Sequence, residues 1–293
     1  PPNFIPYMSS ISELLTGDPL HEEILTTAGT LASREKLPAY VVGGYVRDML
    51  LGRVSNDIDI MVEGDGIAFA KKLAKELKVD ITVDYDKFNT ALIPHPQLEI
   101  EVASARKEEY ESDSRKPEVF PSTVEEDMSR RDFTVNAIAA SILPDTFGEL
   151  YDPFGGLKDL QKGLIITPLD PDETFSDDPL RMLRAVRFAA QLEYNVAATT
   201  LDSISRNIKR MEIISWERIR DEIIKCLKAE TPSIAFYLMK DTGLLAHVFP
   251  ELDIMSGVDV IDGKGHKDVF IHTLQVVDNA AKLTPNMDVR FAA

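Results

Sequence analysis

The spacing of apolar and polar residues changes along this chain and separates two regions. Between residues 39 and 105, several short segments are apolar runs or alternate apolar and polar residues at a period of two, as is typical of β-strands, and helical patterns lie between some of them. From Asp177 to about His247 the apolar positions recur at a helical period. We therefore predict an α/β domain with a mixed sheet of about five strands over residues 1–170, followed by an all-helical region.

The predicted elements of the α/β domain follow from this patterning. Strands are expected at AYVVGG (39–44), NDIDIMVEG (56–64), ITVDYD (81–86), TALIPH (90–95) and QLEIEVASA (97–105). Helices are expected at 11–36, at 45–52, where Gly52 ends the helix, and at 66–78. RRDFTVNAIAASI (130–142) predicts a helix or a strand beginning near Phe133, and LIITPL (164–169) a short strand.

Residues 107–129 interrupt this pattern. They are polar and highly charged, and their few apolar residues have no period. We predict a mobile loop there.

The composition is that of a globular protein. Apolar residues make up 44% of the 293 residues and charged residues 28%. No apolar run approaches the ~18 residues of a membrane span, and the first residues do not resemble a secretory signal. With a single cysteine, Cys226, which we interpret as a small buried residue, a cytoplasmic protein without a membrane partner is expected.

The net charge of −17 argues against nucleic-acid binding when it is averaged over the whole chain. The charge is unevenly distributed, however. The stretch from Arg181 to Lys228 holds ten Lys and Arg against six Asp and Glu. A polyanion could bind there if these cations share one face.

The candidate chemistry begins at Asp57 and Asp59. Residues two apart on a strand point to the same side, about 6.5–7 Å apart. Such a pair suits Mg²⁺, although a pair of this kind can also be a solvated strand face. Gly43 and Gly44 precede it, and glycines let backbone N–H groups approach phosphate oxygens. The combination favours metal-assisted phosphoryl transfer, and no P-loop motif is present.

LPAYVVGGYVRDMLLGRVSNDIDIMV (37–62) resembles the opening signature of the class II tRNA nucleotidyltransferase and bacterial poly(A) polymerase family. Further segments follow in the order of that family: RRDFTVNAIA (130–139), YDPFGGLKDL (151–160), DDPLRMLRAVRFAAQL (177–192) and ERIRDEIIKCL (217–227). The resemblance implies a nucleotidyltransferase head of residues 1–170 and a helical neck and body of residues 171–264 that selects the nucleotide and binds RNA.

The resemblance also implies a reaction. The enzyme would transfer CMP and AMP from CTP and ATP to the 3′ end of tRNA without a template, completing CCA. Asp57 and Asp59 would hold two Mg²⁺ ions, and Glu101 would be a third catalytic carboxylate, or else an edge-strand charge. No DNA partner is expected.

The same resemblance assigns nucleotide-binding residues in the head. Gly43, Gly44 and Arg47 would face the phosphates. Arg131, Asp132 and Asn136 would act on the incoming nucleotide, with the last two near the sugar. The alternative for Arg131 and Asp132 is a structural ion pair.

DDPLRMLRAVRF carries the predicted selection residues. On a continuous helix Asp178 and Arg181 would share a face, where an acceptor beside a guanidinium can present a fixed pattern to a base edge. The alternative is an exposed salt bridge. Arg184 and Arg187 would continue toward the triphosphate, whereas Glu217, Arg218 and Glu222 would brace the helices.

HKDVFIHTLQVVDNAAKL (266–283) resembles the start of an HD phosphohydrolase domain, so residues 265–293 form a third predicted segment. His272 would be the first ligand of a metal site that this chain does not complete.

Three alternatives to CCA addition stay open from the sequence. They are a poly(A) polymerase, an enzyme that adds only CC or only A, and a non-catalytic RNA-binding relative. The stretch after Asp59 lacks the basic block usual in poly(A) polymerases of this family, which favours tRNA as the substrate.

Overall fold

The computed structural model describes residues 9–55, 57–79, 82–109, 118–257, 260–261, 264–265 and 268–293. The chain divides into two compact units, Pro1–Lys162 and Gly163–Ala293. The division precedes the boundary suggested near residue 170, because strand β10 (Leu164–Ile165) pairs with β11 (Asn195–Val196) of the second unit. No helix of the described residues combines the length and the hydropathy that a membrane span requires.

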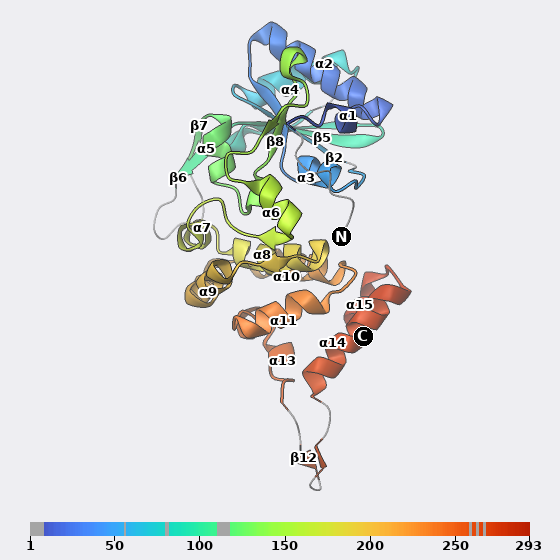
Figure 1. Ribbon diagram of the computed structural model, residues 1–293, viewed down its shortest axis with the longest axis vertical. Coiled ribbons are helices and arrows are strands. Elements are labelled where there is room, and N and C mark those ends of the chain that lie inside the picture. Colours follow the sequence, from blue (N-terminus) through green and yellow to red (C-terminus); the bar gives the residue numbers. More distant parts are fainter. Residues whose placement is uncertain are drawn as a thin grey trace. The chain divides into compact units, whose positions relative to one another are not determined.

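The first unit is built on a mixed sheet of seven strands in the order β3-β4-β5-β2-β1-β8-β9. Its strands β2, β5 and β8 are labelled in Figure 1. Its strands are β1 (Ala39–Val42), β2 (Asp57–Val62), β3 (Val83–Tyr85), β4 (Thr90–His95), β5 (Leu98–Ser104), β8 (Ala139–Ser141) and β9 (Leu150–Tyr151). Strands β2 and β5 run parallel, and the other neighbours are antiparallel. The predicted fold class is confirmed, but five strands were too few. Strands β8 and β9 are too short for a period of two to be visible.

Six helices accompany this sheet in the described part of the first unit. They are α1 (Ser12–Leu15), α2 (Pro19–Glu35), α3 (Gly44–Leu50), α4 (Gly66–Glu76), α5 (Val124–Ser129) and α6 (Gly156–Lys162). Helix α4 packs against β2, β4 and β5, and α2 packs against α4. Gly52 follows α3 with a φ of 66°, as its position in the pattern predicted.

The two faces of β2 have different surroundings. Ile58, Ile60 and Val62 are buried. On the opposite face, Met61 packs in an apolar cluster with Met128 of α5, whereas Asp57 at the start of the strand is exposed. On this face the apolar cluster covers only the end of β2 near Met61, and the end that carries Asp57 stays accessible to solvent.

The prediction of a mobile loop at residues 107–129 is wrong for the residues of this stretch that the structure describes. Strands β6 (Arg106–Glu109) and β7 (Glu118–Pro121) form an antiparallel pair, and α5 follows. Residues 110–117 lie outside the described residues. The sequence analysis missed this pair because β6 (RKEE) is entirely polar and β7 (EVFP) is a run of four residues, so neither shows an alternation of apolar and polar positions.

The second unit is mostly helical. Its helices are α7 (Pro171–Asp177), α8 (Leu180–Leu192), α9 (Ala198–Asn207), α10 (Trp216–Leu227), α11 (Ser233–Asp241), α12 (Leu245–Val248), α13 (Pro250–Asp253), α14 (Val269–Leu283) and α15 (Met287–Ala292). Besides β10 and β11, it contains the two-residue strands β12 (Val260–Ile261) and β13 (Lys264–Gly265).

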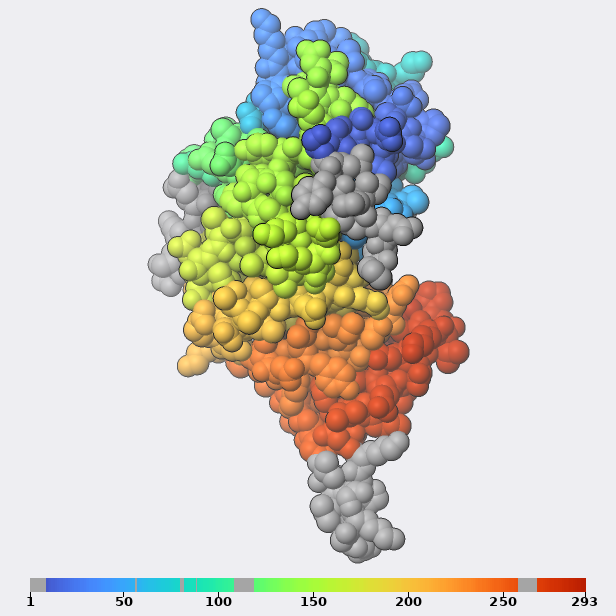
Figure 2. All heavy atoms as spheres, in the orientation of Figure 1, coloured from blue at the N-terminus to red at the C-terminus, as the bar shows by residue number. Residues whose placement is uncertain are grey.

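Arg290 ties the C-terminal helices to the rest of this unit. The buried guanidinium donates to the carbonyl oxygens of Leu227 at 2.8 Å, Ala229 at 3.0 Å, Ala281 at 2.9 Å and Thr284 at 2.8 Å. These carbonyls belong to the ends of α10 and α14 and to the residues just after them, where helical partners are missing. Figure 2 shows the C-terminal helices in red against the orange surface of the helices before them.

Candidate active site

Four carboxylates gather on one face of two adjacent parallel strands. The register places Asp57 of β2 opposite Glu99 of β5, and Asp59 opposite Glu101. The structure thus brings the three predicted catalytic residues to one face and adds Glu99, which the sequence analysis missed. Its signal was the alternation of Glu with aliphatic residues in β5, but only the strand register shows which residues the glutamates face.

The environment of Asp59 disfavours its charged form. Burial raises the pKa of this carboxyl from 3.8 to about 6; the charges of Glu101 and Asp57 act in the same direction, and those of Arg131 and Arg47 oppose them. A cation bound here would stabilise the charged form of Asp59, which offsets the cost of its burial and the repulsion from Glu101 and Asp57.

The acidic face has the donor chemistry of a Mg²⁺ site that substrate would complete. Among the described residues, no three His, Cys, Asp or Glu side chains form a group that could enclose a metal ion by themselves. Mg²⁺ keeps several waters and commonly takes one or two carboxylates together with substrate phosphates. Asp57 and Asp59 therefore fit this metal as a pair without a further protein ligand.

A glycine turn precedes α3 in the same unit. Gly43 has a φ of 68°, and a Cβ atom on it would lie 2.7 Å from Nη1 of Arg131. Gly44 begins the helix, and a Cβ there would meet Nη2 of Arg47 at an ordinary 3.7 Å. At Gly43, therefore, both the positive φ and the closeness of Arg131 disfavour a larger residue, whereas neither does so at Gly44.

Arg47, Asp132 and Asn136 form a buried network beside this turn. Nη1 of Arg47 donates to Oδ1 of Asn136 at 2.5 Å, and Nδ2 of Asn136 donates to Oδ1 of Asp132 at 3.0 Å. The same Arg47 pairs with Asp48 at 2.9 Å. The segment predicted as a helix or a strand from near Phe133 begins with a short 3₁₀ turn of residues 134–136, and its strand, β8, starts only at Ala139.

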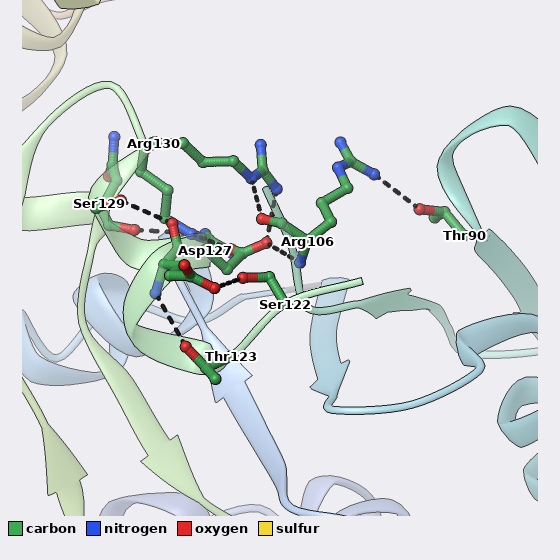
Figure 3. Close-up of polar contacts among 10 residues, drawn as sticks. Thr90, Arg106, Ser122, Thr123, Asp127, Ser129 and Arg130 are labelled. Atoms are coloured by element: carbon green, nitrogen blue, oxygen red, sulfur yellow. Dashed lines mark hydrogen bonds and ion pairs between the residues drawn. The ribbon is translucent and has the colours of Figure 1, made fainter. Parts of the chain in front are cut away.

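Asp127, which the sequence analysis did not single out, anchors Arg131. Asp127 is 1% exposed, and its carboxylate accepts hydrogen bonds from Arg130 and the backbone N–H of Arg106 (Figure 3). It also accepts two hydrogen bonds from Arg131. Burial alone would raise the pKa of Asp127, but the charges of Arg131 and Arg130 bring it below its usual value. This carboxylate thus stays ionised inside the head.

The YDPFGG segment supports the same region. Asp152 accepts from the backbone N–H groups of Gly156 at 2.6 Å and Leu157 at 2.9 Å, which caps α6. Asp159 of α6 accepts from the hydroxyl of Thr134 at 2.7 Å. A Cβ atom on Gly156 would lie 2.1 Å from the carbonyl oxygen of Thr134, so this glycine permits the close approach.

The remaining predicted residues belong to the second unit, and the continuous helix expected there is wrong. Asp177 ends α7 and Leu180 begins α8, because Pro179 lacks an N–H group and disfavours helical backbone at Asp178. Asp178 accepts from the backbone N–H of Leu180 at 3.1 Å and from Nη2 of Arg218 at 3.1 Å. Asp178 therefore lies just before α8, where its carbonyl oxygen accepts from the backbone N–H of Arg181 at 3.0 Å, and not within one continuous helix with Arg181.

Arg181 and Arg187 are both buried within this unit. Nη1 of Arg181 donates to the carbonyl oxygen of Thr174 at 3.3 Å. Nε of Arg187 donates to the buried Glu222 at 2.6 Å. Nη1 of Arg187 donates to the side-chain oxygen of Gln191 at 2.7 Å, so its guanidinium is held between α8 and α10. Arg184 lies over the ring of Phe188 at 5.3 Å.

His272 is exposed on α14. The resemblance of residues 265–293 to an HD domain has no counterpart in the family matches, which both end before these residues.

Two family models match this chain. The model described as "Poly A polymerase head domain" matches residues 39–166, and that described as "Probable RNA and SrmB- binding site of polymerase A" matches residues 193–255. A tRNA nucleotidyltransferase solved with a primer tRNA and an incoming ATP analogue is 30% identical, with a TM-score of 0.71 over 87% of this chain and 68% of that one.

The chain belongs to the tRNA nucleotidyltransferase and poly(A) polymerase family.

Other members of this family have more specific names. An A-adding tRNA nucleotidyltransferase of Geobacter sulfurreducens is 34% identical over 92% of this chain and 29% of its own length. A multifunctional CCA protein of Nitrosospira multiformis is 34% identical over 88% of this chain and 60% of its own length. The CCA-adding enzyme of Thermotoga maritima, solved with tRNA, is 34% identical with a TM-score of 0.72 over 83% of this chain and 56% of that one. The chain thus spans about a third to three fifths of these relatives.

Proposed function

We propose that this nucleotidyltransferase adds CMP and AMP, taken from CTP and ATP, to the 3′ end of tRNA and so completes CCA. The observation that carries the proposal is the acidic face of β2. Asp57 and Asp59 lie there beside Glu101, and the pKa of Asp59 is raised to about 6, as expected for a carboxylate that a cation must neutralise.

Asp57 and Asp59 would hold two Mg²⁺ ions. When bound, such ions favour deprotonation of the attacking 3′-hydroxyl and neutralise the charge on the triphosphate. The Gly43 turn, Arg47 and Arg131 supply positive potential beside the carboxylates. Asp132 and Asn136 keep Arg47 in place and would lie near the sugar of the incoming nucleotide.

Base selection would fall to the second unit. Asp178 and Arg181 offer an acceptor and a guanidinium, the two chemistries needed to read a base edge. Arg184 would contact the triphosphate, whereas Arg187 and Glu222 would keep α8 packed on α10. The basic stretch from Arg181 to Lys228 would bind tRNA through its phosphates and shape.

A second candidate is addition of A alone. It is favoured by the Geobacter sulfurreducens relative, which is named an A-adding enzyme and is 34% identical over 92% of this chain. The CCA protein of Nitrosospira multiformis has the same identity over 88%, so identity does not choose between the two.

Incorporation of labelled CTP and ATP with Mg²⁺ tests the proposal. The acceptors are tRNA ending at the discriminator base, after C and after CC, with an unrelated RNA as a control. Addition of CC and then A, only on tRNA, supports CCA synthesis. One AMP, only on tRNA ending in CC, supports the A-adding alternative, whereas long AMP runs on any RNA refute both in favour of a poly(A) polymerase.

Variants identify the residues that carry the reaction. Asp57→Asn and Asp59→Asn should abolish incorporation. Glu99→Gln removes a carboxylate from the same face without touching the proposed metal pair, so it should retain activity. Normal turnover in either Asp variant would refute the metal assignment.

A further inference from the structure

Asp127 is a buried carboxylate whose two oxygens serve different parts of the head. Oδ1 accepts from Nε of Arg131 at 3.1 Å and from Nη2 of Arg131 at 3.0 Å. Oδ2 accepts from Nη2 of Arg130 at 2.7 Å and from the backbone N–H of Arg106 at 3.2 Å. One oxygen thus ties α5 to β6, and the other holds one arginine.

This arrangement leaves Arg131 little freedom. With Nε and Nη2 on Asp127, its remaining terminal nitrogen, Nη1, donates to the carbonyl oxygen of Asn136 at 3.4 Å. The same Nη1 occupies the space beside Gly43, 2.7 Å from where a Cβ atom would stand. The guanidinium plane is therefore fixed on one side by Asp127 and set against the glycine turn on the other.

We propose that Asp127 is a positioning residue of the nucleotide site, which holds the Arg131 guanidinium against the Gly43 turn so that its charge meets the incoming triphosphate. The inference rests on the proposed function. It adds a residue, outside the RRDFTVNA segment, on which the placement of Arg131 depends.

The pair geometry separates this role from simple bracing of α5. The bond of Arg130 to Asp127 and the bond of its Nε to the carbonyl oxygen of Arg106, at 3.0 Å, already join α5 to β6. Arg131 does not contribute to the contact between α5 and β6, because its hydrogen bond beyond Asp127 goes to the carbonyl oxygen of Asn136. Because Nε and Nη2 of Arg131 both donate to Oδ1 of Asp127, these two charge-assisted hydrogen bonds hold the orientation of the guanidinium.

The test measures kcat and KM for ATP on tRNA ending in CC. Asp127→Asn keeps an acceptor for Arg131 but removes the charge, and a displacement of about 1 Å at a reacting group can lower activity roughly 10²-fold. We expect kcat/KM to fall at least about tenfold, with unchanged circular dichroism. Glu126→Gln, an exposed neighbour on α5, should have no effect.

Double variants distinguish positioning from bracing. If Asp127 acts through Arg131, adding Asp127→Asn to Arg131→Ala should cause no further loss, whereas Asp127→Asn added to Arg130→Ala should still lower kcat/KM. Independent losses in the Arg131 background would overturn the proposal.

A further variant keeps the inference testable if Asp127→Asn does not fold. Arg131→Lys retains the charge but cannot contact Asp127 and the carbonyl of Asn136 with one planar fork, so it should also lose activity. Wild-type activity of Arg131→Lys would overturn the positioning role. Failure of the unmodified chain to incorporate any nucleotide would instead refute the proposed function.

Discussion

Replacing Asp59 by asparagine tests whether this carboxylate is maintained for function at the expense of stability. Its pKa in the folded protein is about 6, above the ordinary 3.8, chiefly because it is buried and faces Glu101. A carboxyl with a raised pKa stabilises the fold while it is protonated. That contribution is fully present below about pH 4 and is lost as the pH rises through 6.

The size of the effect follows from the two pKa values. A factor of ten in a protonation equilibrium corresponds to about 1.4 kcal/mol, so the difference between 3.8 and about 6 corresponds to about 3 kcal/mol at neutral pH. Asparagine has nearly the same shape and no charge. Because Asp59 is partly accessible to solvent and water relieves part of the penalty, we expect Asp59→Asn to raise the free energy of unfolding by about 1–3 kcal/mol.

Urea unfolding in EDTA, followed by circular dichroism, measures this gain at pH 7.5 and at pH 4.5. The gain should be large at pH 7.5 and mostly absent at pH 4.5, where wild-type Asp59 is protonated in the folded state. Mg²⁺ in place of EDTA should stabilise the wild type more than the variant, because it binds only the folded protein. The exposed Asp57→Asn is the matched control and should change stability less.

Two results would refute the reasoning. One is a loss of stability in Asp59→Asn at pH 7.5 without metal, because the carboxylate would then stabilise the fold. The other is an equal gain at both pH values, because the effect would then not come from the charge of Asp59.

Three further predictions concern packing. Gly43→Ala should lower the free energy of unfolding by roughly 1–3 kcal/mol in urea unfolding, because of its positive φ and the contact with Arg131, whereas Gly44→Ala should be nearly neutral. Glu222→Ala should cost roughly 3–5 kcal/mol, since it leaves Arg187 charged and unneutralised in the interior; a loss under about 1 kcal/mol would contradict the buried pair. Burial raises the pKa of Cys226 to about 12, so a thiol reagent at pH 8 should react with it slowly until urea unfolds the protein, and fast reaction of the native protein would show an accessible thiol.

The elements that the sequence predicted well are those set by spacing within a few residues. The period of two in DIDIMV placed Asp57 and Asp59 on one face of β2, and the helical period from Gly66 onward gave α4. Pro179 also carried a local signal. This proline separates α7 from α8, because a proline disfavours helical backbone at the residue before it. The prediction of one continuous helix did not take this restriction into account.

Other features depended on contacts that no local pattern contains. Glu99 and Glu101 lie beside the Asp pair only because β5 runs parallel to β2 in a given register. Asp127 looked like one acid in a charged loop, and its burial between Arg130 and Arg131 comes from the way α5 packs. The all-polar strand β6 and the four-residue strand β7 show no alternating apolar face from which their pairing could be predicted.

The sequence by itself therefore determined the chemical types present: an acidic pair on a strand, a glycine turn before it, and the segments that resemble this family. The tertiary structure alone decided which distant charges surround Asp59, what holds Arg131, and that Arg187 is paired with Glu222 in the interior. The physical reason is that strand register and the burial of charged pairs arise from packing between residues far apart in the chain, whereas helix and strand periods arise from neighbours.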